Sequence, residues 1–78
     1  MGNPMDSIKK TLSLALDAQE DMDRQQEQLN ELVAENPEAA TDYKVRQWQA
    51  LIDTIRAEAQ ENQRLCEEAI SRGLIREI

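Results

Sequence analysis

Histidine and phenylalanine are absent from the chain, and its 78 residues include only two glycines, two prolines and one cysteine. Without histidine the chain lacks the commonest general base and the commonest zinc ligand, which excludes a hydrolytic triad and the usual zinc sites. Two isolated glycines exclude a glycine-rich phosphate loop. We therefore expect a protein that is not an enzyme and has no catalytic residue, no cofactor and no metal site.

The single cysteine, Cys66, excludes an intrachain disulfide and fits a reducing compartment. It falls on an apolar helical stripe, where we interpret it as a small buried side chain; a redox role or an interchain disulfide is the alternative. No run approaches the roughly 18 apolar residues that a membrane-spanning helix needs. We expect a soluble, cytoplasmic protein with no membrane partner.

Acidic residues outnumber basic ones by 16 to 9, which gives a net charge of −7. This balance repels phosphate backbones and anionic lipids, so we expect no nucleic-acid partner. The acids cluster in the first half of the chain, at Asp17, Glu20, Asp21 and Asp23, and continue to Glu31. Most of them fall outside the apolar stripe, which favours a solvated face over a metal site.

Pro4, Asn36–Pro37 and Gly73 divide the chain into two long segments that are rich in Ala, Leu, Glu, Gln and Arg. This composition predicts an all-α fold, an antiparallel hairpin of two coiled-coil-like helices in one domain over residues 1–78. We expect the first helix over about 4–35, a turn around 36–41, the second helix over about 38–72 and a short apolar tail at 73–78. The second helix has two possible N-caps, Asn36 and Thr41–Asp42, and Gly73 either ends it with a left-handed residue or lies within it.

Each segment carries an apolar seam in steps of three and four residues, the pattern of helices that pack against one another. The first seam contains Met5, Ile8, Leu12, Ala15, Gln19, Met22, Gln26, Leu29 and Val33. The second contains Val45, Trp48, Ile52, Ile55, Ala59, Asn62, Cys66 and Ala69. The polar members are interpreted either as specificity determinants or as hydrated positions.

Below about 80 residues a single core rarely supplies more than roughly 3–5 kcal/mol, so we expect association to complete the burial. Two hairpins forming a homodimeric four-helix bundle, or one hairpin holding a partner protein's helix, would achieve this. The predicted function is a non-enzymatic protein–protein interaction module that self-associates and is adaptor-like or chaperone-like. The predicted interface residues are Leu12, Met22, Leu29, Trp48, Ile52, Ile55, Leu65, Leu74, Ile75 and Ile78.

A second hypothesis is an acidic inhibitor or regulator that binds a basic site on a larger protein. It depends on the excess of acids in the first helix, where Glu20, Asp21, Asp23, Glu27 and Glu31 would make the contacts. Salt would weaken such a complex strongly, whereas a seam-driven complex would change little.

The chain also resembles the small helical-hairpin proteins of bacterial type III secretion systems, the needle subunits and small helical co-chaperones. The resemblance consists of the total length, the Asn36–Pro37 turn, Tyr43 soon after it, and the closing residues 73–78, which read GLIREI. It implies a small structural or chaperone component of such a system. The stretch 62–68, NQRLCEE, departs from the needle pattern and counts against a needle role, whereas a chaperone-like role, which has looser requirements, stays compatible with it.

Overall fold

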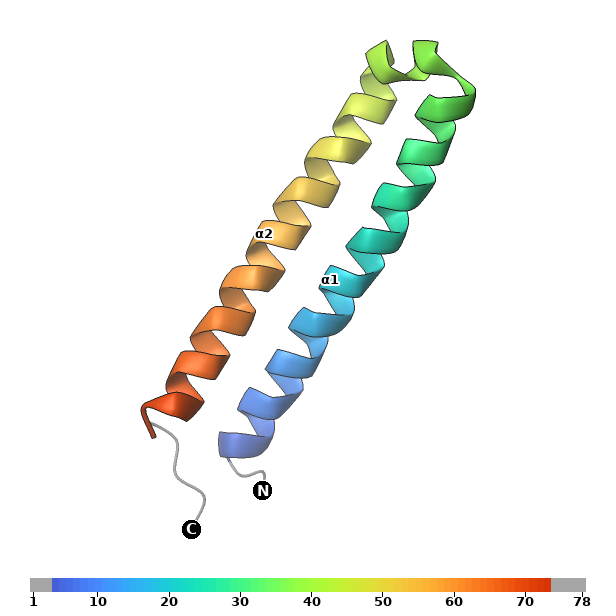
Figure 1. Cartoon of the computed structure of the whole chain (residues 1–78). Coiled ribbons are helices and arrows are strands. Elements are labelled where there is room, and N and C mark those ends of the chain that lie inside the picture. The colour runs from blue at the N-terminus through green and yellow to red at the C-terminus, as the bar shows by residue number, and fades with distance from the viewer. Residues whose placement is uncertain (1–3, 74–78) are drawn as a thin grey trace.

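The computed structural model describes residues 4–73 and shows two long helices side by side in an antiparallel hairpin (Figure 1). Helix α1 spans Pro4–Glu35, a short 3-10 helix η1 spans Pro37–Thr41, and α2 spans Tyr43–Ser71. The hairpin measures 57 × 19 × 16 Å. The predicted all-α hairpin is confirmed. Pairing of hairpins into a bundle remains a prediction.

The turn between the helices is shaped by a proline, which restricts the residue before it, and by an aspartate that caps the second helix. Asn36 precedes Pro37 and has non-helical geometry, with φ −134° and ψ 84°, because a proline disfavours helical geometry in the residue before it. Its side chain caps nothing. Asp42 caps α2 instead, with its carboxylate accepting a 2.8 Å hydrogen bond from the Lys44 backbone N–H. The second helix therefore starts at Tyr43 and not at residue 38, and η1 occupies the residues between.

Helix α2 ends at a left-handed glycine, the first of the two predicted alternatives. Gly73 has φ +67°, and its N–H donates to the Ile70 carbonyl at 3.1 Å. The preceding Arg72 N–H reaches the Glu68 carbonyl at 2.9 Å. A positive φ carries no steric cost for glycine, so this residue can satisfy the last carbonyls of the helix.

The core is a single row of apolar side chains between α1 and α2. Met22, Leu29 and Ile52 form its centre, and Ile52 is completely buried. Val33, Val45 and Trp48 pack against this cluster on the side of the turn. Toward the open end of the hairpin most of the buried positions described are small, namely Ala15, Ala59 and Cys66, and Met5 is the one large residue among them. Cys66 is a buried free thiol, as predicted.

The face that α2 presents to α1 is rotated from the predicted seam. Asn62 is exposed and Ile55 is 37% exposed, whereas Gln49, Arg56 and Gln63 are half-buried. The predicted assignment of Asn62 to the seam is wrong. The physical reason is that each of these three polar side chains finds a partner on α1, so their rotation toward α1 satisfies hydrogen bonds that would otherwise be lost.

Candidate protein-interaction site

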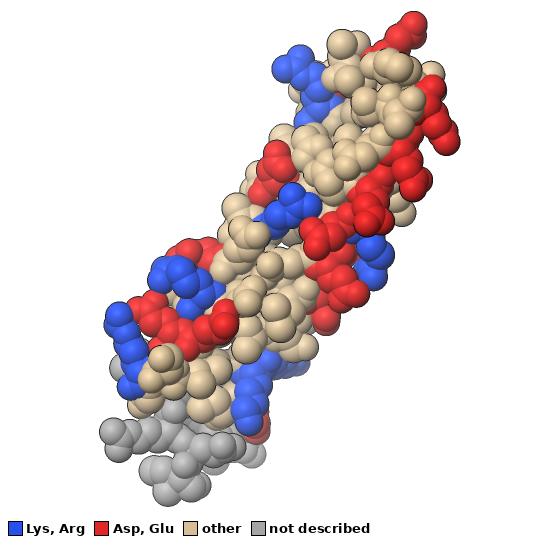
Figure 2. All heavy atoms as spheres, in the orientation of Figure 1, with Lys and Arg blue, Asp and Glu red and all other residues tan. Residues whose placement is uncertain are grey.

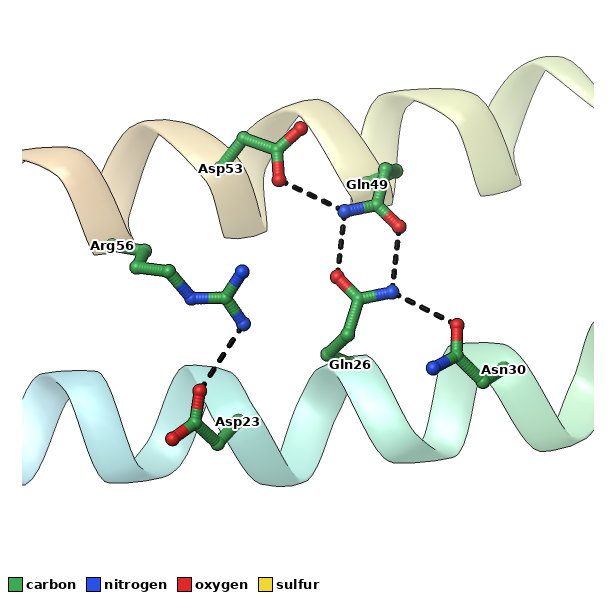
Figure 3. Close-up of polar contacts among 6 residues, drawn as sticks. All are labelled: Asp23, Gln26, Asn30, Gln49, Asp53 and Arg56. Atoms are coloured by element: carbon green, nitrogen blue, oxygen red, sulfur yellow. Dashed lines mark hydrogen bonds and ion pairs between the residues drawn. The ribbon is translucent and has the colours of Figure 1, made fainter.

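One face of the hairpin is closed by polar contacts between the helices, centred on Gln26 and Gln49 (Figure 3). Gln26 Nε2 donates to Gln49 Oε1 at 2.8 Å, and Gln49 Nε2 donates back to Gln26 Oε1 at 2.7 Å. Each amide group uses its second N–H within its own helix, toward Asn30 at 3.0 Å or Asp53 at 2.9 Å. All four amide N–H groups are therefore satisfied, which leaves this pair no donor for a partner.

Two further cross-helix contacts extend this polar arrangement toward the open end. Arg56 Nη2 lies 3.2 Å from Asp23 Oδ1, and Gln19 Nε2 donates to Gln63 Oε1 at 2.6 Å. The Arg56 side chain is 29% exposed and that of Asp23 is 71% exposed, so the ion pair lies at the rim of the helix interface. These contacts fix the register of α1 against α2. The ion pair adds little to the stability of the fold, because exposed ion pairs contribute little to the free energy of folding.

The opposite face of the hairpin is open and mostly apolar. A shallow groove of about 250 Å³ runs between the helices there and is lined by Thr11, Leu14 and Ala18 of α1 and by Ile55 and Asn62 of α2, among others. Farther toward the turn, Trp48 Nε1 on α2 donates to Gln25 Oε1 on α1 at 3.0 Å. Residues seven apart lie on the same side of a helix, which places Leu32 beside Gln25 and Leu65 beside Glu58 on this face.

We call this surface the Leu51 face. It comprises Thr11, Leu14, Ala18, Gln25 and Leu32 of α1 and Trp48, Leu51, Ile55 and Leu65 of α2. Leu14 and Leu51 are each 59% exposed, and Leu65 is 50% exposed. Large apolar side chains gathered on one face of a small protein are typical of a surface that contacts another protein.

Charges are distributed unevenly around the hairpin. Between Lys44 and Glu58 the charged residues of α2 are Arg46, Asp53 and Arg56. Asp53 and Arg56 lie with the polar contacts (Figure 3), and Arg46 lines a hollow together with Gln49 of the same polar group, so none of the three lies on the Leu51 face. Figure 2 shows acidic side chains gathered along the α1 edge of the molecule. The Leu51 face is therefore uncharged on α2 over a span of nearly four turns, beside a strongly acidic edge.

The predicted interface residues fall into three groups. Met22, Leu29 and Ile52 are buried between α1 and α2, so in the hairpin they contact the other helix. Leu12 and Trp48 are half-buried, and Ile55 and Leu65 are exposed on the Leu51 face. The remaining three lie outside the described residues: Leu74, Ile75 and Ile78.

Two prominent residues of the Leu51 face, Leu14 and Leu51, were not among the predicted interface residues. The signal that indicates them is a second apolar stripe beside the seam, since Leu51, Ile55 and Leu65 lie on one side of α2. Leu14 belongs to the same surface through the groove that it lines together with Ile55.

The ionisable groups with shifted pKa values lie at the outer surface of α2. Arg64 donates to both oxygens of Glu61, at 2.6 and 3.1 Å, and to Glu68 at 2.8 Å. The hydrogen bond from Arg64 lowers the pKa of the Glu61 carboxyl, and Glu61 in turn raises the pKa of Arg64. An exposed pair on one helix is typical of a surface ion pair and supports no chemistry of its own.

Within residues 4–73 no group of three or more His, Cys, Asp and Glu side chains is placed to hold a metal ion. Neither α1 nor α2, as described, contains an apolar stretch long enough to cross a membrane.

Comparison of the chain with family models, with curated proteins and with solved structures found no match. The resemblance to type III secretion hairpins therefore stays a prediction. Indications of function therefore come from the geometry of the two faces of the hairpin, the one closed by polar contacts and the Leu51 face.

Proposed function

We propose that the protein is a non-enzymatic interaction module, adaptor-like or chaperone-like, that self-associates through the Leu51 face. The observation that supports this proposal is the contrast between the two faces of the hairpin. On one face the cross-helix side chains are bonded to one another, whereas on the other Leu14, Leu51 and Leu65 are at least half exposed. Burying such apolar surface is favourable by roughly 25 cal/mol per Å².

The thinness of the hairpin core adds a second reason for association. Two helices bury one row of side chains between them, and toward the open end the described part of that row consists of Ala15, Ala59 and Cys66, which are small, and of Met5. Small side chains remove less apolar area from water than Leu or Ile. A second layer of helices over the Leu51 face would complete the burial, as in four-helix bundles.

The experiment is molar mass by light scattering over a roughly hundredfold dilution, with circular dichroism on the same samples. We expect a mass of about two chains at high concentration. The Leu51→Glu variant should have the mass of one chain and retain its helicity, because residue 51 is largely exposed in the hairpin. A wild-type protein with the mass of one chain at every concentration would refute self-association.

A matched control is Leu16→Glu. Leu16 is 46% exposed and precedes Asp23 by seven residues, which places it on the face that carries the Arg56–Asp23 ion pair. This variant should keep the dimeric mass. If Leu16→Glu and Leu51→Glu dissociate the dimer equally, the Leu51 face is not the interface.

The acidic edge of α1 supports a second candidate function, an inhibitor or regulator that binds a basic site on a larger protein. Of the eight acids in α1, Asp21 alone is not fully exposed, and α1 contains only three bases. Binding of an oligo-lysine probe should weaken strongly between low and moderate ionic strength. Equal affinity at the two ionic strengths, or no binding at low salt, would contradict this function.

A further inference from the structure

We propose that two copies of the chain pair antiparallel through α2, with a two-fold axis at Leu51, so that Lys44 of each copy faces Glu58 of the other. This inference rests on the proposed self-association and specifies its geometry. It is carried by the exposed stripe of α2 and by the positions of the two charges that end it.

The stripe is centred on Leu51. At 100° per residue, Lys44, Ile55 and Glu58 all point within about 40° of the direction of Leu51. Trp48 and Thr54 lie at its two margins, about 60° to either side. All of these residues belong to α2, and no charged residue lies on the stripe between Lys44 and Glu58. The stripe is therefore an uncharged patch, with Leu51 at its centre and the polar Gln47 and Thr54 on one side, a cation at one end and an anion at the other.

The spacing of the two charges determines the orientation of the pair. Lys44 and Glu58 each lie seven residues from Leu51, or about 10.5 Å along the helix axis in opposite directions. A two-fold axis at Leu51 exchanges the two positions, which brings each ammonium group opposite a carboxylate. A parallel pair in register would instead place Lys44 against Lys44 and Glu58 against Glu58, and like charges directly opposite repel.

The remaining contacts of this register are compatible with a helix interface. Trp48 comes beside Ile55 of the other copy on one margin of the interface, Gln47 comes beside Thr54 on the other margin, and Leu51 meets its own equivalent. Gln47, Leu51 and Thr54 also line a shallow hollow of about 340 Å³ on the outer surface of α2. A side chain of the second copy can enter this hollow, as ridges enter grooves in helix packing.

Lys44 and Glu58 are both available for pairing. Both residues are exposed, and among the described residues neither side chain takes part in an ion pair or hydrogen bond. Arg64, by contrast, is already engaged within its own helix by Glu61 and Glu68. The new pair selects the antiparallel orientation, whereas the apolar stripe supplies most of the affinity.

The charges of the two helices favour contact of a second copy with α2 rather than with α1. Tyr43–Ser71 contains five acids and four bases, whereas Pro4–Glu35 contains eight acids and three bases. Contact through α2 therefore joins two nearly neutral surfaces. The two acidic edges remain outside the contact, where water and salt screen their repulsion.

Site-directed disulfides test the orientation. In the Cys66→Ser background, Lys44→Cys and Glu58→Cys proteins are mixed in equal amounts and oxidised, and the dimers are identified by mass spectrometry. Antiparallel pairing places residue 44 beside residue 58 of the other copy, so the mixed disulfide should exceed either homodimer severalfold. Asp53→Cys in the same background, on the opposite face, should form no dimer beyond the level of random collision.

The outcomes separate this inference from the proposed function. Dominant 44–44 and 58–58 homodimers would show a parallel pair and overturn it. An absence of disulfides, in samples that scatter light as two chains, would place the interface elsewhere and also overturn it. A wild-type mass of one chain refutes the self-association itself.

Charge reversal gives an independent readout. Lys44→Glu and Glu58→Lys should each raise the dimer dissociation constant about three- to tenfold, since each change affects two symmetric pairs. The double variant Lys44→Glu/Glu58→Lys restores both pairs and should return to near the wild-type constant. Additive weakening in the double variant would overturn the predicted register.

Discussion

Gln26 of α1 and Gln49 of α2 exchange two hydrogen bonds across the hairpin, at 2.8 and 2.7 Å. Such a reciprocal amide pair forms only when the two helices have one alignment, because a shift of either helix by one residue separates the two side chains. Leu29 and Ile52, the neighbours of this pair in the core, would accept several alignments, since apolar contacts are not directional. The glutamines therefore select the register of the hairpin.

A double-mutant cycle on this pair measures their coupling. Gln26→Leu and Gln49→Leu should each cost about 1 kcal/mol of stability, because the remaining amide loses both cross-helix bonds in a half-buried position. The double variant should cost less than the sum, with a coupling energy of about 1 kcal/mol, since no amide is then left without a partner. Urea denaturation at fixed protein concentration gives these values; strictly additive costs would contradict the pairing.

Ile52→Ala should destabilise the hairpin more than other single truncations. Ile52 is completely buried, and shortening such a side chain to Ala costs about 2–5 kcal/mol. That is comparable to the stability expected of a core this small, so the variant should lose most of its helicity at room temperature. Leu16→Ala, at a position 46% exposed, serves as the control and should keep its thermal midpoint within a few degrees. An equal loss in both variants would contradict the position of the core.

Removing one or the other candidate cap of α2 should change the stability of the hairpin by different amounts. Asp42→Ala should lower stability by about 1 kcal/mol, because it removes the carboxylate that accepts from the Lys44 N–H. Asn36→Ala should change stability little, since the Asn36 side chain makes no capping hydrogen bond. Thermal denaturation followed by circular dichroism compares the two variants. A larger loss in Asn36→Ala would show that α2 is capped at the earlier site.

The Glu61–Arg64 pair predicts a local pH effect. Because Arg64 lowers the pKa of Glu61, the group binds its proton less readily in the folded chain than in the unfolded one. Its contribution to stability is present above the unfolded pKa of a glutamate and is lost as the pH falls through the lowered folded value. NMR titration of the Glu61 carboxyl should show the lowered pKa, and Arg64→Gln should return it toward the ordinary value. An unchanged titration in that variant would exclude Arg64 as the cause.

The sequence predicts the buried side of α1 well because most of its seam residues are apolar and clearly favour a buried position. Met5, Ala15, Met22 and Leu29 are all buried, and Asn36 ends the helix before Pro37. Left-handed geometry at Gly73 was one of two stated alternatives, and glycine is the residue that adopts it without strain.

The orientation of α2 could not be predicted in the same way. The spacing of three and four residues favours Ile55 over the polar Arg56 as a seam position, and from Ile55 and Ala59 the same spacing leads to Asn62 and not to Gln63. The rotation of α2 is decided by partners on α1, Asp23 for Arg56 and Gln19 for Gln63. The apolar periodicity of one segment contains no information about such pairs. The same rotation turns Leu51 and Ile55 away from α1, which is why Leu51 was missed as a candidate residue, whereas Leu14 was missed because it lies off the α1 seam.

The uneven distribution of side-chain size along the core has a consequence for how the hairpin opens. Met22, Leu29 and Ile52 hold the helices together at the centre of the core, whereas toward the open end the buried side chains are Ala15, Ala59 and Cys66, with Met5 as the one large residue described there. Opening free energies follow the apolar contacts that are broken. Backbone amides should therefore exchange with solvent sooner toward the open end of the hairpin and latest near Ile52. The two helices would thus begin to separate at the open end, while the centre of the core and the turn stay closed.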